Sequence, residues 1–113
     1  MSDRRILVID DERHIARLLE INLQRQGFLV KTAFRLQEAR KLLAEKVYEA
    51  MVLDSSMPDG DADGFMREVQ EDPRHASMKI VRLGDDDIPN GPPPGGLSLT
   101  KPFNPMLIGD FLG

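Results

Sequence analysis

Short apolar runs alternate along the chain with longer amphipathic segments, as strands and helices do when they follow one another. The apolar runs have the length of buried strands and lie at residues 5–9, 28–33, 48–54, 79–83 and 97–100. Apolar residues at helical spacing predict helices from residue 11 or 12 to Gly27, over 36–46, over 65–71 and over 105–112. This alternation favours an α/β fold, a parallel sheet with helices on both faces, in one domain over residues 1–113.

One interval breaks the alternation, because residues 84–96 read GDDDIPNGPPPGG. Three consecutive prolines flanked by glycines cannot sustain an α-helix, so we expect an extended, partly polyproline loop in place of the fourth helix. The missing helix would expose apolar side chains that favour association, namely Ile80, Leu83, Leu97 or Leu99. The alternative is that residues 88–94 fold back and cover the gap.

Charged residues stand where three of the apolar runs end. Asp10 and Asp11 follow the first run, Asp54 ends the third, and Lys101 follows the fifth. In a parallel sheet these ends share one edge, which is where open α/β sheets bind their ligands. Three carboxylates beside one ammonium are costly unless a divalent cation and an anion join them. The simpler interpretation, in which each aspartate only caps a helix or turn, is plausible for any one of them but not for the set.

Composition narrows the classes of function. The 113 residues carry a net charge of −4, which gives no support for non-specific nucleic-acid binding. The absence of cysteine excludes disulfides and thiolate metal sites. No apolar stretch approaches membrane-spanning length and the start of the chain lacks a signal-peptide core, so a cytoplasmic location is the default expectation.

Three motifs together resemble the receiver domain of two-component response regulators. They read ILVIDDE at residues 6–12, VLDSSMP at 52–58 and LTKPF at 99–103. Each is weak alone, but their order and their positions at strand ends make the combination specific, and the resemblance covers essentially the whole chain. It implies a flavodoxin-like, doubly wound sheet of five parallel strands in the order 2-1-3-4-5, here without the fourth helix and with a short last helix.

The resemblance also assigns roles to residues at the strand ends. It makes Asp54 the phosphoacceptor, which receives its phosphoryl group from a histidine kinase or a phosphotransfer protein. Asp10 and Asp11 would hold Mg²⁺ together with Asp54 and the backbone carbonyl of Ser56, and Lys101 would pair with the phosphoryl group. Such a protein catalyses its own phosphorylation but is not a turnover enzyme.

Two positions depart from the family pattern. Gly84 stands where the family usually has a threonine or serine that contacts the phosphoryl group, and Ser98 stands where it has a tyrosine or phenylalanine. We therefore expect an atypical output, in which residues 84–96 or the surface near them meet a downstream protein or a second copy of the chain. The main alternative is a pseudo-receiver, an interaction module that works independently of phosphorylation. A Mg²⁺-dependent phosphatase or phosphotransferase acting on a small substrate is a third possibility, for which the sequence shows neither a second acid–base group nor a substrate pocket.

The segment DGDADG at residues 59–64 resembles the start of a calcium-binding loop. Such a loop needs a bidentate glutamate at its twelfth position, where this chain has Gln70. The alternative is a solvated turn in which Asp63 caps the next helix.

Overall fold

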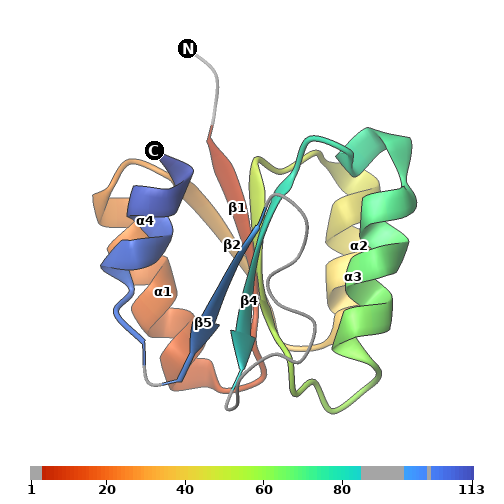
Figure 1. Ribbon diagram of the computed structural model, residues 1–113, viewed down its shortest axis with the longest axis horizontal. Helices are drawn as coiled ribbons and strands as arrows, with labels where there is room; N and C mark the ends of the chain where they lie inside the picture. The colour runs from red at the N-terminus through yellow and green to blue at the C-terminus, as the bar shows by residue number, and fades with distance from the viewer. Residues whose placement is uncertain (1–3, 85–95, 102) are drawn as a thin grey trace.

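The computed structural model describes residues 4–84, 96–101 and 103–113, and all counts of elements below refer to these ranges. Its strands are β1 (Arg5–Ile9), β2 (Leu29–Ala33), β3 (Ala50–Asp54), β4 (Lys79–Gly84) and β5 (Leu97–Thr100). Its helices are α1 (Arg13–Arg25), α2 (Leu36–Glu45), α3 (Ala62–Glu71), the 3-10 turn η1 (Pro73–His75) and α4 (Met106–Leu112). The strands pair in parallel in the order β2-β1-β3-β4-β5 (Figure 1), which confirms the predicted fold class and strand order.

The sheet lies between two layers of helices. Helices α1 and α4 cover one face and α2 and α3 cover the other (Figure 1). Because alternate residues of a strand point to opposite faces, Ile6 and Val8 enter the core under α1 and α4. Leu7 and Ile9 enter the core under α2 and α3. All four are 0% exposed, so burial on both faces explains why β1 reads as a continuous apolar run.

The element boundaries differ from the predicted ones by a few residues. Strands β2, β3 and β4 begin or end one or two residues from the expected positions, and α2 and α4 are each one residue shorter. Helix α1 starts at Arg13, with Glu12 as its N-cap, and it is followed as expected by Gly27 at a φ of +98°. None of the helices within the described ranges is long and apolar enough to cross a membrane.

The start of α3 corrects the predicted cap. Helix α3 begins at Ala62, not at residue 65, because the side chain of Asp61 accepts a hydrogen bond from the backbone N–H of Asp63 at 3.2 Å. Asp63 is therefore not the cap, and its carboxylate instead accepts from Arg82 Nε at 2.9 Å.

The three aspartates of the 59–64 segment have separate partners. The carboxylate of Asp59 accepts from the backbone N–H groups of Leu36 and Gln37, at 2.9 and 3.1 Å, and so caps α2 from a distant loop. These two hydrogen bonds hold the pKa of Asp59 below its usual value. Because Asp61 caps α3 and Asp63 pairs with Arg82, the three carboxylates do not converge as calcium ligands must.

The predicted loss of the fourth helix falls on residues 85–95, which lie outside the described ranges. The structure does contradict the expected exposure of Ile80 and Leu83, which are only 3% and 0% exposed. Leu97 and Leu99 are half-buried and pack against the core under α1 and α4.

The short helix α4 offers a direct test of this packing. Ile108 is 0% exposed, so Ile108→Ala should leave a cavity and lower the free energy of unfolding by about 2–5 kcal/mol. Its neighbour Leu107 is 44% exposed, and Leu107→Ala should cost about 1 kcal/mol or less. Urea denaturation of both variants measures the difference. Equal losses would contradict the docking of α4 on the sheet.

Candidate functional site

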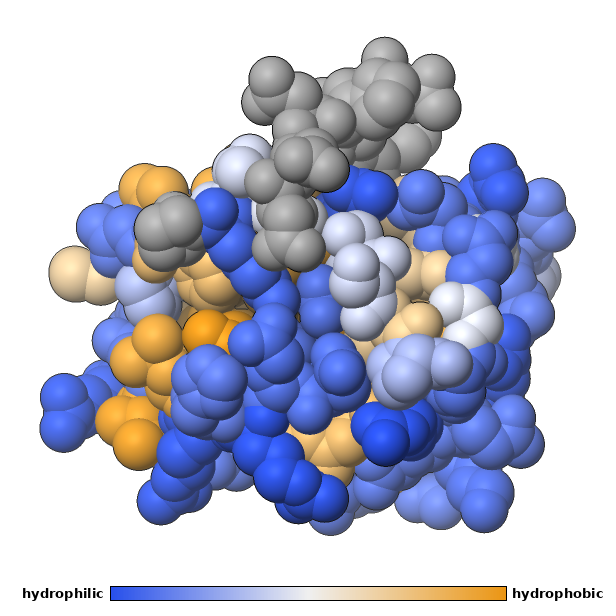
Figure 2. Space-filling model, turned by 90° about the horizontal axis from the view of Figure 1, so that it is seen from below, coloured by the Kyte–Doolittle hydropathy of each residue, from blue (hydrophilic) through white to orange (hydrophobic). Residues whose placement is uncertain are grey.

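The parallel register brings the predicted site residues to one edge of the sheet. Asp10 follows β1, Asp54 ends β3 and Lys101 follows β5. Backbone hydrogen bonds fix two of them, from Asp10 N–H to the Ala33 carbonyl at 3.0 Å and from Lys101 N–H to the Gly84 carbonyl at 2.7 Å. Figure 2 views the molecule from this carboxyl edge, where polar residues dominate and the most hydrophobic of the visible residues, drawn in full orange, gather on the side of α1 and α4.

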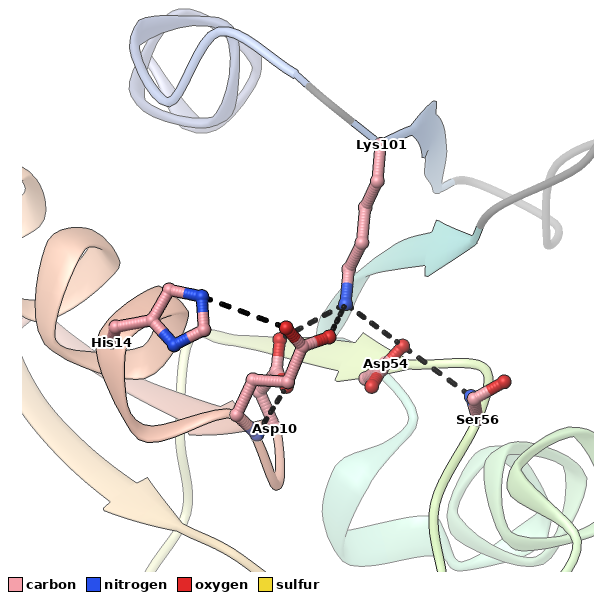
Figure 3. Close-up of polar contacts among 6 residues, drawn as sticks. Asp10, His14, Asp54, Ser56 and Lys101 are labelled. Atoms are coloured by element: carbon pink, nitrogen blue, oxygen red, sulfur yellow. Dashed lines mark hydrogen bonds and ion pairs between the residues drawn. The ribbon is translucent and has the colours of Figure 1, made fainter.

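One ammonium group bridges three carboxylates at this edge. The Nζ atom of Lys101 lies 3.4 Å from Asp54 Oδ1, 3.6 Å from Asp10 Oδ2 and 3.1 Å from Glu12 Oε1 (Figure 3). With all four groups ionised, the cluster carries three negative charges and one positive charge. The formal balance of −2 equals the charge that one divalent cation would neutralise.

Burial makes this charge imbalance costly. Asp10 is 0% exposed and Asp54 is 3% exposed. Burial, reinforced by the charges of Asp54 and Glu12, raises the pKa of Asp10 to about 6, although the Glu12 N–H and Lys101 oppose the shift. Burial also raises the pKa of Asp54, and the charge of Asp11 adds to the effect.

The surroundings of Lys101 shift its pKa in the direction that keeps the side chain charged. Burial lowers the pKa of Lys101, but the hydrogen bond to Glu12 and the charges of Asp10 and Asp54 outweigh burial and raise the pKa overall. Lys101 therefore remains an ammonium at neutral pH, with its side chain only 14% exposed.

The carboxylates are placed as ligands of a cation. Asp10, Glu12 and Asp54 each offer one oxygen, and the three oxygens lie within 4.8 Å of one another. Asp10 Oδ2 is buried and accepts no hydrogen bond from the part of the chain that the structure describes. An all-oxygen donor set suits hard cations such as Mg²⁺ and Ca²⁺. The residues present therefore fit a divalent cation.

The other two predicted metal-binding residues, Asp11 and Ser56, lie around this group of carboxylates rather than within it. Asp11 is outside the group of three mutually close carboxylates, although its charge acts on Asp54. The backbone N–H of Ser56 donates to Asp54 Oδ1 at 3.3 Å, which places Ser56 beside the Asp54 carboxylate.

Sequence reasoning missed Glu12, which was interpreted only as the start of a helix. Its carboxylate reaches both Lys101 and, at 3.6 Å, Nε2 of the exposed His14 (Figure 3). The signal available in the sequence was the run of three acidic residues that begins at Asp10.

The two departures from the expected pattern also lie near this edge. Gly84 ends β4 and pairs in register with Thr100, and it carries no side chain that could contact a ligand. Ser98 pairs with Arg82, and its Oγ is buried without a hydrogen-bond partner among the described residues.

Comparisons with known proteins agree on one family. The family model described as "Response regulator receiver domain" matches residues 6–88. The transcriptional regulatory protein GltR of Pseudomonas aeruginosa is 36% identical over 82 residues, which cover 73% of this chain and 34% of that protein. The matched part of the chain spans between 18% and 47% of the length of four curated relatives.

Solved structures share the fold along nearly the whole chain. The chemotaxis protein CheY4 of Vibrio cholerae superposes with a TM-score of 0.85 and 24% identity, over 98% of this chain and 97% of that one. The response regulator protein TrrA of Thermotoga maritima, in complex with Mg²⁺ and BeF, gives a TM-score of 0.78 and 27% identity. That match covers 95% of this chain and 94% of TrrA.

The raised pKa of Asp10 predicts an unusual dependence of stability on pH. Between the unfolded value of 3.8 and the folded value of about 6, the folded protein binds more protons than the unfolded chain. The free energy of unfolding of the metal-free protein should therefore fall as the pH rises through this window. Asp10→Asn should remove the share of this fall that comes from Asp10 and stabilise the metal-free protein by about 1–3 kcal/mol above pH 7.

Denaturation in EDTA at a series of pH values measures the effect. The gap between Asp10→Asn and wild type should widen from pH 4 to 6 and then level off. Parallel pH profiles of the two proteins would contradict the assignment of the raised pKa to Asp10.

Proposed function

Because the chain belongs to the family of response regulator receiver domains, we propose that it accepts a phosphoryl group on Asp54 in two-component signalling. The donor would be a histidine kinase or a histidine phosphotransfer protein. The observation that carries the proposal is the buried Asp54 carboxylate at the carboxyl edge, beside Asp10 and 3.4 Å from Lys101. We infer a phosphoprotein that catalyses its own modification rather than a turnover enzyme.

The transfer step needs an ionised Asp54. Its carboxylate oxygen attacks the phosphorus of a phosphohistidine, and the bond from phosphorus to the imidazole nitrogen breaks as the new P–O bond forms. The imidazole leaves with the electron pair and takes up a proton, and Asp54 becomes an acyl phosphate. Lys101 serves as a fixed positive charge beside the incoming phosphoryl oxygens, since positioning and electrostatics dominate phosphoryl transfer.

We propose Mg²⁺ as the cation of this site, held by Asp10, Asp11, Asp54 and the backbone carbonyl of Ser56. When bound, it supplies the positive charge that lets two anions approach each other. Asp10 Oδ2 accepts no hydrogen bond from the described residues and has only the Lys101 ammonium nearby at 3.6 Å. This position and the raised pKa of Asp10 support the proposal, because both mark a carboxylate whose charge is incompletely compensated. TrrA, a similar protein, is described in complex with Mg²⁺ and BeF.

The output of the domain is a separate proposal. Gly84 and Ser98, whose Oγ has no hydrogen-bond partner within the described ranges, favour a readout that does not use a hydroxyl on β4 and an aromatic ring on β5. We propose that a downstream protein binds residues 84–96 or the surface near them, with a homodimer as one form of this contact. The same two residues support the alternative of a pseudo-receiver that ignores phosphorylation. We further propose a cytoplasmic location, with no direct binding to nucleic acid or membrane.

Intact mass separates these functions. After incubation with Mg²⁺ and acetyl phosphate or phosphoramidate, the protein should gain one phosphoryl group, and Asp54→Asn should gain none. Asp110→Asn, an exposed carboxylate on α4, is the matched control and should gain the group as wild type does. Lys101→Met should slow the gain by roughly tenfold or more, the effect of losing one positioned charge.

Other outcomes would identify the alternatives. A wild-type protein that gains no mass with either donor, in the presence of Mg²⁺, would contradict phosphoacceptance and support the pseudo-receiver. Continued release of inorganic phosphate over many turnovers would support a phosphatase instead.

The proposed set of Mg²⁺ ligands includes Asp11 but not the adjacent Glu12, and this difference can be tested. Asp11→Asn should weaken Mg²⁺ binding by roughly tenfold or more, because it removes a proposed ligand. Glu12→Gln should weaken it less, because the Glu12 carboxylate already accepts from Lys101 at 3.1 Å. Isothermal titration calorimetry with Mg²⁺ measures both affinities. A larger loss for Glu12→Gln would transfer the ligand role from Asp11 to Glu12.

A further inference from the structure

Strand β2 forms one outer edge of the sheet, at the opposite side from β5 (Figure 1). The N–H of Leu29 donates to the Arg4 carbonyl at 2.8 Å, on the side where β2 pairs with β1. Because backbone groups alternate in direction along a strand, Val30 and Thr32 direct their N–H and C=O groups away from β1. No strand within the described ranges pairs with β2 on that side. The edge therefore offers two donors and two acceptors to a further strand.

A pocket of about 190 Å³ lies beside this edge, between the start of β2 and the end of α2. Its apolar lining includes Leu29 of β2, Leu42 of α2 and Tyr48. Val30 also lines the pocket, although its side chain packs against the core on the opposite face, under α1 and α4. The backbone of Val30 therefore borders the pocket, and a segment that pairs with the edge would pass beside the pocket.

The pocket is basic, although the chain as a whole carries a net charge of −4. Arg5, Lys31 and Lys46 line it, against Glu45 as the acidic member of the lining. Both lysines are exposed, and neither forms an ion pair within the part of the chain that the structure describes. Anionic groups are therefore the complementary ligands for this surface.

A second copy of the chain is disfavoured as the occupant of this edge. Two β2 strands paired edge to edge would bring Lys31 and Lys46 of one copy close to the same residues of the other, and like charges on facing strands repel. Charged residues on edge strands commonly prevent such self-association. The same lysines would attract a strand of opposite charge, and Leu29, which is 51% exposed, offers it an apolar contact.

We propose that the β2 edge binds an extended acidic segment of a partner protein, which adds to the sheet as a further strand. The backbone of the segment pairs with Val30 and Thr32, and its carboxylates meet Lys31 and Lys46. This surface is separate from Asp54 and from residues 84–96. The inference therefore goes beyond the proposed function and does not rest on phosphoryl transfer.

Amide NMR with a synthetic peptide tests the proposal. The probe is a hexapeptide of alternating glutamate and valine, acetylated and amidated at its ends, which is titrated into the ¹⁵N-labelled full chain. At saturation, the amide protons of Val30 and Thr32 should shift and should exchange with solvent roughly tenfold more slowly, because the added strand accepts hydrogen bonds from them. A matched peptide with glutamine in place of glutamate should bind roughly tenfold more weakly.

Charge variants identify the surface that the peptide contacts. Lys31→Gln and Lys46→Gln should each weaken binding of the acidic peptide several-fold. Glu45→Gln should strengthen it, because this variant removes the acidic member of the pocket lining. Arg67→Gln, which changes an exposed cation of α3, is the matched control for net charge and should bind as wild type does. Asp54→Asn should also bind as wild type does.

Several results would overturn the inference. Peptide binding that leaves the amides of Val30 and Thr32 unchanged would exclude strand addition. Equal affinities for the acidic and the glutamine peptide, or equal losses for Lys31→Gln and Arg67→Gln, would contradict charge complementarity. Failure of both peptides to bind at millimolar concentration would overturn the docking surface as a whole. None of these results bears on Asp54, whose phosphorylation is tested separately by intact mass.

Discussion

The burial of two carboxylates beside a single ammonium is the constraint on which the site depends. Asp10 and Asp54 are almost fully buried, and one ammonium, that of Lys101, stands between them. Burial raises the pKa of both carboxyls, so ionising each of them at neutral pH lowers the free energy of unfolding of the metal-free protein. A cation among the carboxylates would relieve this cost and would bring a phosphoryl donor within reach of Asp54. The burial and close approach of these carboxylates destabilise the metal-free protein, and the same two features would make the cation-bound site reactive.

The sheet supplies the rigidity that this arrangement requires. Strands β1 and β3 are buried on both faces, and residues 6–9 and 50–53 are at most 1% exposed. Burying one such aliphatic side chain contributes about 1.5–3 kcal/mol, so displacing either strand would expose several apolar side chains at a large cost in free energy. Because each charged residue comes at or directly after a strand end, the parallel register alone sets the spacing among Asp10, Asp54 and Lys101. The positions of the charged residues at the edge are thus set by the backbone pairing of the buried strands.

Most of the fold follows from the sequence, because continuous apolar strands and amphipathic helices are local signals. The strand order came from a family resemblance, and Asp10, Asp54 and Lys101 came from their places at strand ends. The sequence could not show that Asp59 caps α2 or that Asp63 forms an ion pair with Arg82. Both contacts join residues 19 to 23 positions apart. The role of Glu12 was hidden for a similar reason, since its partner Lys101 lies 89 positions away. Polar pairs of this kind depend on how the helices and strands pack in three dimensions, and the periodicity of apolar residues along the chain does not specify which distant side chains meet.

We propose that one magnesium ion joins Asp10 and Asp54 at the edge of the sheet. Carboxyl ¹³C NMR of the protein during a Mg²⁺ titration would show whether both carboxylates bind the same ion. The carboxyl resonances of Asp10 and Asp54 should shift with a single common affinity, and the apparent pKa of Asp10 should fall from about 6 as Mg²⁺ is added. Resonances of Asp10 and Asp54 that do not respond to millimolar Mg²⁺, or that respond with separate affinities, would contradict it.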